Sequence, residues 1–166
     1  MVSEGTVRLV HAPLLGLITL IGIVTLAMSA SLVAHYNSHG YPNISYRDRI
    51  RIILAGSIWS FFVSVFLVVG VAVKPDNVLF GIFAHIIGLA IAFILLLIGV
   101  ASLTALTDKL HCSGIENFSR CKVVKGLVGV TWTQTVLLFI ALIFVFALGV
   151  KARSGGGMRR STLVNA

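Results

Sequence analysis

Four long stretches without acidic or basic residues constrain the fold of this chain more than any other feature. No Asp, Glu, Lys or Arg occurs between Arg8 and Arg47, or within residues 52–73, 77–107 and 126–150. Each stretch can cross a hydrocarbon core of about 30 Å as a helix, which takes roughly 20 apolar residues. None shows the polar face of a soluble amphipathic helix. The sequence therefore predicts four membrane-spanning helices.

The predicted architecture is all-α: an antiparallel, up-down transmembrane four-helix bundle. Pro13 suits the first turn of the first helix. The short reversal at 74–77 makes the second and third helices antiparallel neighbours, and larger loops are expected at 35–49 and 107–122. The predicted segments are an N-terminal stretch 1–11, a four-span domain 12–150 with spans at about 12–34, 50–73, 78–106 and 123–150, and a basic tail 151–166.

The composition excludes a soluble domain. The chain is 58% hydrophobic and 11% charged, whereas about a quarter of the residues in soluble domains are charged. The net charge of +8 does not indicate nucleic-acid binding, because the basic residues lie in loops, at span ends and in the tail. At those positions Lys and Arg contact lipid headgroups. Nucleic acid is not an expected partner.

An even number of spans places both termini on one side, but basic residues do not identify that side. Six lie with the termini and the 74–77 turn, and seven lie with the two larger loops. The positive-inside rule does not decide between sides that are so nearly equal.

The cysteines and two glycosylation sequons favour one orientation. The only cysteines, Cys112 and Cys121, share the 107–122 loop, and a disulfide between them would persist only in an oxidising compartment. The candidate acceptors Asn43 and Asn117 begin Asn-X-Ser sequons in the two larger loops. Such tripeptides also occur by chance, and these two lie close to the membrane. Together the features favour cytoplasmic termini.

A zinc site is the alternative reading of the cysteine loop. His111, Cys112 and Cys121 could supply three ligands, with a fourth from His35 or His39. Their spacing matches no common zinc pattern. We therefore expect no metal, and no other cofactor.

Several features resemble the fungal MARVEL-type membrane proteins. They are the segment Tyr46-Arg47-Asp48-Arg49-Ile50, Trp59 in the second span, the 74–77 reversal, a long third span, the two-cysteine loop and Trp132. The resemblance covers about residues 14–150. It implies a four-helix bundle with cytoplasmic termini and a role in membrane apposition, microdomain organisation or vesicle traffic. It implies no catalytic residues.

Small residues mark the faces on which helices are expected to pack. His85 shares one face of the third span with small side chains, and the second span has a small, polar stripe. Small residues let helix backbones approach closely, and a buried neutral His would hydrogen-bond across such a contact. A proton relay would need an acidic partner, and no predicted span contains Asp or Glu. The packing residues are Gly81, His85, Gly88, Ala92 and Gly99, with Gly56, Ser60 and Ser64.

The fourth span has the most polar intramembrane segment, which includes Thr131, Gln134 and Thr135. Gln134 can hydrogen-bond across helices, or the three residues can line a crevice for lipid or ligand. The crevice reading leads to an alternative function: a small transporter or channel whose path passes His85 and Gln134.

No enzyme motif is present: the sequence has no nucleophile elbow, phosphate loop, paired carboxylates or zinc-protease helix. We expect a non-catalytic scaffold, microdomain organiser or accessory subunit in the plasma membrane or secretory pathway. The expected partners are another membrane protein or a second copy, and lipids, with sterol as one candidate. Anionic headgroups should contact the tail residues Lys151, Arg153, Arg159 and Arg160.

Overall fold

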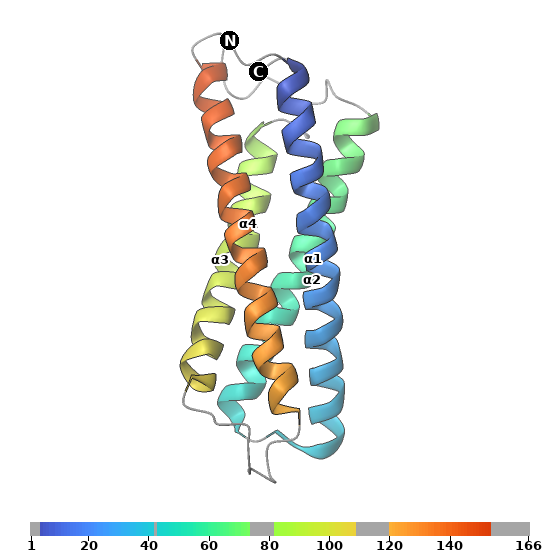
Figure 1. Ribbon diagram of the computed structural model, residues 1–166, viewed down its shortest axis with the longest axis vertical. Helices are drawn as coiled ribbons and strands as arrows, with labels where there is room; N and C mark the ends of the chain where they lie inside the picture. Colours follow the sequence, from blue (N-terminus) through green and yellow to red (C-terminus); the bar gives the residue numbers. More distant parts are fainter. Residues whose placement is uncertain (1–3, 42, 74–81, 109–119, 154–166) are drawn as a thin grey trace.

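The computed structural model describes residues 4–41, 43–73, 82–108 and 120–153, which form four α-helices and no strands. Both the start of the first helix and the end of the last lie at the same end of the molecule (Figure 1). The prediction of an all-α four-helix bundle is therefore confirmed. The helices are α1 (Glu4–His39), α2 (Ile44–Val73), α3 (Ile82–Thr107) and α4 (Cys121–Arg153).

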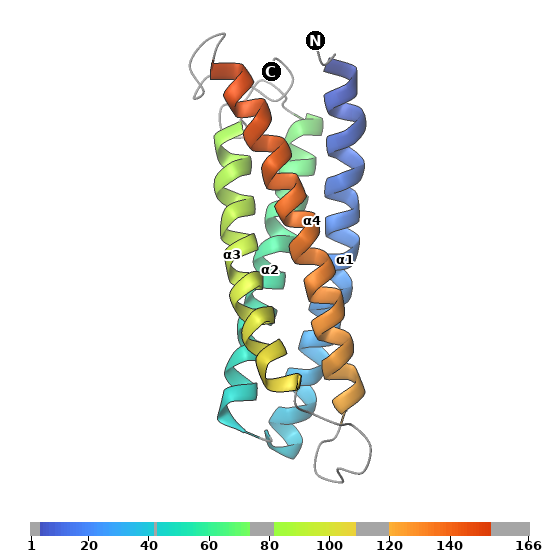
Figure 2. The same cartoon turned by 60° about the vertical axis from the view of Figure 1, so that its left-hand side comes forward.

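Each helix packs against two others, in the order α1, α2, α3, α4 and back to α1. The helices α2 and α4 therefore face each other across one diagonal of the bundle, and α1 and α3 across the other (Figures 1 and 2). We call the end with the α1–α2 and α3–α4 connections the loop end, and the opposite end the terminal end.

All four helices are long and apolar enough to cross a membrane, so the chain is a multi-pass membrane protein. The spans are Pro13–His39, Ile44–Val69, His85–Thr107 and Cys121–Ala147. Large apolar side chains are exposed on the outer faces, including Leu20 at 64%, Phe62 at 65% and Phe146 at 62%. Extended apolar surfaces are rare on soluble monomers, and the bilayer accounts for them here.

The interior is filled mainly by aliphatic side chains from all four helices. Ile18, Ile53, Leu96, Leu127 and Leu138 are each completely buried. Each helix thus has one face in this core and another toward lipid, although both faces are apolar. This explains why the sequence shows little amphipathic pattern.

Both ends of α1 and the start of α2 differ from the predicted boundaries. The helix α1 begins at Glu4, so Pro13 lies inside it and not in its first turn. Residues 35–39 and 44–49, predicted as loop, are helical. Gly40 has a positive φ of 84° and follows the end of α1, a conformation that glycine adopts without steric cost.

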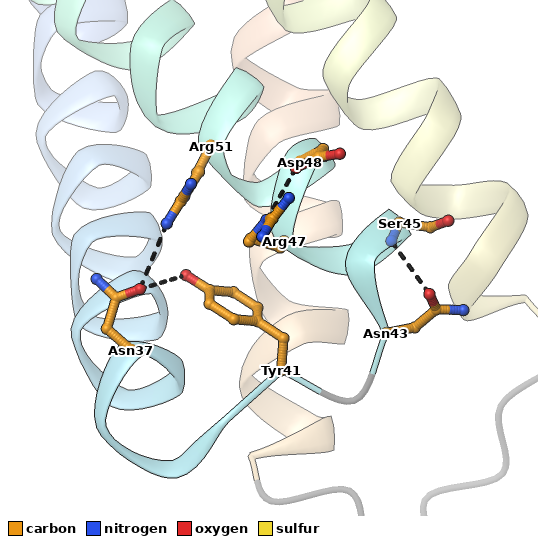
Figure 3. Close-up of polar contacts among 7 residues, drawn as sticks. All are labelled: Asn37, Tyr41, Asn43, Ser45, Arg47, Asp48 and Arg51. Carbon is orange, nitrogen blue, oxygen red and sulfur yellow. Dashed lines mark hydrogen bonds and ion pairs between the residues drawn. The ribbon is translucent and has the colours of Figure 1, made fainter.

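Asn43 caps the start of α2, which accounts for its early beginning. The Asn43 side-chain Oδ1 accepts a hydrogen bond from the Ser45 amide at 3.3 Å, and its carbonyl accepts one from the Tyr46 amide at 3.1 Å. Figure 3 shows the side-chain contact. Capping by Asn satisfies amides that have no partner within the helix.

Polar side chains join α1 to α2 at the loop end (Figure 3). Asn37 Oδ1 accepts hydrogen bonds from the Tyr41 hydroxyl at 3.0 Å and from Arg51 Nη2 at 3.5 Å. The Arg51 guanidinium lies 5.8 Å from the centre of the Tyr41 ring, within range of a cation–π contact. These contacts hold the short connection against both helices.

Candidate functional site

A polar contact at the centre of the bundle joins two helices that are not packing neighbours. Gln134 of α4 is completely buried, and its Nε2 donates a hydrogen bond to Ser60 Oγ of α2 at 3.1 Å. The bond spans the α2–α4 diagonal. We call Ser60, Ser64 and Gln134 the central polar cluster.

A glycine of α1 completes the surroundings of Gln134. A Cβ atom added at Gly22 would lie 3.2 Å from Gln134 Nε2, which is tighter than ordinary van der Waals contact. Three helices therefore shape this site. Gly22 was not among the predicted packing residues. The only feature of the sequence that could have indicated its role is that it is a small residue within an apolar span.

Six other buried hydroxyl groups bond to their own helices. Each donates to the carbonyl four residues earlier, a frequent arrangement for Ser and Thr within helices. These bonds satisfy the hydroxyl hydrogens locally. They are Thr25 to Ile21 at 3.0 Å, Ser29 to Thr25 at 2.8 Å, Ser57 to Ile53 at 2.8 Å, Thr107 to Leu103 at 3.1 Å, Thr131 to Leu127 at 2.7 Å and Thr135 to Thr131 at 2.8 Å.

Two atoms of the central polar cluster have no hydrogen-bond partner among the described residues: Ser64 Oγ and Gln134 Oε1. Both side chains are at least 99% buried. Most buried polar atoms in proteins have a partner, so each exception requires an explanation.

Apolar side chains of α2 and α4 bound the central polar cluster at both ends. About two helical turns from Ser60 and Gln134, Leu67 and Ala141 are buried toward the terminal end, and Ile53 and Leu127 are buried toward the loop end. The residues of α4 that were predicted to line a polar crevice, Thr131, Gln134 and Thr135, therefore do not form a continuous polar path.

The α2–α3 contact is built around glycines. A Cβ at Gly88 would lie 2.8 Å from Val63 Cγ1, and one at Gly99 would lie 2.8 Å from Ile53 Cγ1. A Cβ at Gly56 would lie 3.0 Å from Leu96 Cδ2. These distances leave no room for a side chain, so the absence of one permits the close approach.

The remaining residues predicted on this face of α3 are His85 and Ala92, both completely buried, and Gly81. Gly81 lies outside the described residues. Since Gly88 is level with Val63, His85 lies about one turn from that level toward the terminal end.

Both tryptophans donate hydrogen bonds to α3 from neighbouring helices, which the sequence could not reveal. Trp59 Nε1 of α2 donates to the Gly88 carbonyl at 3.3 Å, and Trp132 Nε1 of α4 donates to Thr104 Oγ1 at 3.0 Å. Their side chains are 41% and 37% exposed. Each indole therefore covers the outer edge of a helix contact and still finds a partner for its N–H.

The first turns of α2 satisfy carbonyls in the last turns of α3. The Tyr46 hydroxyl donates to the Leu106 carbonyl at 3.0 Å, and Arg49 Nη1 donates to the Ser102 carbonyl. Carbonyls in the last turn of a helix have no partner within it. These contacts give a structural role to the segment that carried the family resemblance.

The start of α4 is held against α1 at the same end. Arg120 Nη1 donates to Ser31 Oγ at 2.9 Å. The backbone of Arg120 has a φ of 65°, which is uncommon for a residue with a side chain. Cys121 is buried at the first position of α4, and its predicted disulfide partner, Cys112, lies outside the described residues, so that bond stays a prediction.

The other predicted site residues are only partly described. Asn43 is exposed, whereas Asn117, Arg159 and Arg160 lie outside the described residues. The last turn of α4 contains Lys151 and Arg153. Within the described ranges no three His, Cys, Asp or Glu residues lie close enough to hold a metal ion; His111 and Cys112 of the zinc alternative are not in those ranges.

No family model matches the chain, and the searches of curated proteins and of solved structures found no match either. The resemblance to MARVEL-type proteins therefore stays a prediction.

Proposed function

We propose that this protein is a non-catalytic membrane scaffold: a microdomain organiser or an accessory subunit that acts through lateral contacts within the bilayer. The observation that carries the proposal is the interior, where buried apolar side chains of α2 and α4 bound the central polar cluster at both ends. A bundle closed in this way favours lateral packing over passage of a solute.

The chemistry of the interior supports the same proposal. Six buried hydroxyls bond to their own helices. All acidic residues lie outside the predicted spans, at Glu4, Asp48, Asp76, Asp108 and Glu116. Proton or cation transport commonly uses intramembrane carboxylates, and catalysis needs oriented acid, base or metal groups.

The outer faces provide surfaces for lateral contacts. Gly129 of α4 is exposed, and a Cβ added there would meet no atom within 4 Å. Its neighbour one turn along, Thr133, is exposed as well. In this proposal a helix of another membrane protein, or of a second copy, packs on this face, and lipids cover the larger aromatic and aliphatic side chains.

The proposal includes an orientation and a location. Cytoplasmic termini would place the tail beside anionic lipid, where each basic residue contributes about 1 kcal/mol near the surface. The loop end would then face the oxidising side, as a Cys112–Cys121 disulfide requires. The plasma membrane or a secretory compartment satisfies both conditions, in agreement with the family resemblance.

Purification from native membranes in mild detergent tests the scaffold proposal. We expect a stoichiometric partner, identified by mass spectrometry, or a homo-oligomer, identified from the mass of the particle. Gly129→Leu should weaken that association. Gly16→Leu is a matched control, since Gly16 also has open space around it. A monomer without a stoichiometric partner would contradict the proposal.

The second candidate is a small transporter or channel with a polar crevice near His85 and Gln134. The observation that favours it is the pair of buried atoms without a partner, Ser64 Oγ and Gln134 Oε1. Reconstituted liposomes separate the two functions. A transporter should carry solute faster than protein-free vesicles, and Gln134→Leu should abolish that flux; a scaffold should give no flux.

A further inference from the structure

We propose that the central polar cluster binds a single water molecule, held by Gln134 and Ser64 midway along the bundle. The water site does not depend on the scaffold role: it would be present whether the protein is a scaffold or a transporter.

The amide of Gln134 is the first reason. Its carboxamide has a donor end and an acceptor end, and only the donor end has a partner, Ser60 Oγ. Turning the amide by 180° would let its oxygen accept from the Ser60 hydroxyl and would leave the nitrogen without a partner. One end of the group thus needs a further partner in either orientation.

Ser64 is the second reason. It lies one helical turn from Ser60 on the same face of α2, and both are buried. Unlike the six buried hydroxyls that donate to their own helices, Ser64 Oγ has no partner among the described residues. A serine in a helix can easily bond to the carbonyl four residues earlier; Ser64 instead keeps its hydroxyl available.

Water fits the two groups chemically. A buried water typically makes about three hydrogen bonds to polar groups that otherwise lack partners. Here it would donate to Gln134 Oε1 and bond to Ser64 Oγ. A metal cation fits poorly, because no predicted span contains a carboxylate. Lipid headgroups cannot reach side chains that are at least 98% buried.

The surrounding layers determine how such a water behaves. Buried aliphatic side chains lie on both sides of the cluster: Leu67 and Ala141 toward the terminal end, and Ile53 and Leu127 toward the loop end. They separate the site from bulk water at both membrane surfaces. The bound water should therefore exchange slowly and remain beside Gln134 long enough for magnetic cross-relaxation.

The chain offers a direct probe, because Gln134 is its only glutamine. Labelling with side-chain 15N-glutamine gives one carboxamide signal in the full-length protein in nanodiscs. We expect a rotating-frame Overhauser contact between the Nε2 protons and water, with the sign opposite to that of chemical exchange. Contacts to aliphatic protons alone would overturn the proposal.

Two serine variants test which groups hold the water. Ser64→Ala should reduce the water contact at least twofold. Ser57→Ala is the matched control, because the Ser57 hydroxyl bonds to the Ile53 carbonyl of its own helix, and it should leave the contact unchanged. The role of Ser64 would be contradicted if the water contact kept its full intensity in Ser64→Ala. It would also be contradicted if the contact fell equally in both variants. The aliphatic contacts of the Gln134 amide report whether each variant retains the fold.

Discussion

Gln134 and Ser60 are joined by a hydrogen bond of 3.1 Å across the α2–α4 diagonal, between helices that do not share one of the four packing contacts. The core contacts around the rim of the bundle are mostly apolar and non-directional. A directional bond between opposite helices fixes the face that each presents to the centre.

Ser60→Ala should destabilise the bundle more than Gln134→Met does. The alanine variant leaves a buried amide without its partner, which costs about 1–3 kcal/mol. The methionine variant removes the bond and the amide together and keeps an unbranched side chain of similar length, so its cost should stay below about 1 kcal/mol. Unfolding in mixed detergent micelles measures both. The reverse order would mean that the Ser60 hydroxyl is not the partner on which the Gln134 Nε2 group depends.

Gly88→Ala should destabilise the protein, whereas Gly129→Ala should not. The new Cβ at position 88 would meet Val63 Cγ1 at 2.8 Å, and valine cannot easily change its rotamer in a helix. Overpacking of this kind costs about 1–3 kcal/mol. Gly129 has open space around it. Melting temperatures in detergent should fall only for the first variant, and an equal fall in both would show that helix–helix distance is not the cause.

The two tryptophans should report different membrane depths. Trp59 contacts Gly88 and Trp132 contacts Thr104, sixteen residues apart on α3, which corresponds to about 24 Å along the helix. Thr104 lies three residues from the loop end of the α3 span, and Gly88 lies three residues from its other end. In Trp59→Phe the remaining indole should be quenched best by a quencher placed in the leaflet at the loop end, and in Trp132→Phe by one placed in the leaflet at the terminal end. Equal quenching of both variants from the same leaflet would contradict this placement.

Tyr46→Phe should cost about 0.5–1.5 kcal/mol, because it removes the hydrogen bond to the Leu106 carbonyl. Tyr46 is buried, so water does not readily replace the lost hydroxyl. Tyr41→Phe removes a bond to the exposed Asn37 and should cost less. Comparing the two unfolding free energies isolates the link between α2 and the end of α3.

Cys112 and Cys121 should both resist a thiol reagent in the folded, non-reduced protein. Reduction should release two thiols per chain, and an impermeant reagent should then reach them only from the side opposite the termini. Ready labelling before reduction would remove the main argument for cytoplasmic termini, because basic residues do not decide the orientation.

The spans could be predicted from sequence, because in a bilayer the absence of charge over twenty residues is sufficient for a helix. The helix ends could not. Asn37 and Asn43 lie in the segment predicted as a loop, but Asn37 accepts a hydrogen bond from Arg51 and Asn43 caps α2, within the turns nearest the connection. Their roles depend on contacts between segments that the sequence alone does not give.

The central polar cluster was predictable only in part. Gln134 was expected to hydrogen-bond across helices, but Ser57, Ser60 and Ser64 are equivalent in sequence terms, and only the rotation of α2 selects Ser60. Gly22 contacts the amide without any pattern that would have identified it. The predicted polar crevice also included Thr131 and Thr135, whose hydroxyls bond to their own helix.

The local bonding of the buried hydroxyls has a consequence for biogenesis. Because Thr25, Ser29 and Ser57 are satisfied within their own helices, α1 and α2 can enter the bilayer one after the other without waiting for partners. The Ser60–Gln134 bond is different, since its donor arrives only with α4. Until α4 is inserted, Ser60 lacks its diagonal partner, and a chain truncated before Gln134 cannot form this contact. The bond therefore distinguishes a bundle with all four helices inserted from one that still lacks α4.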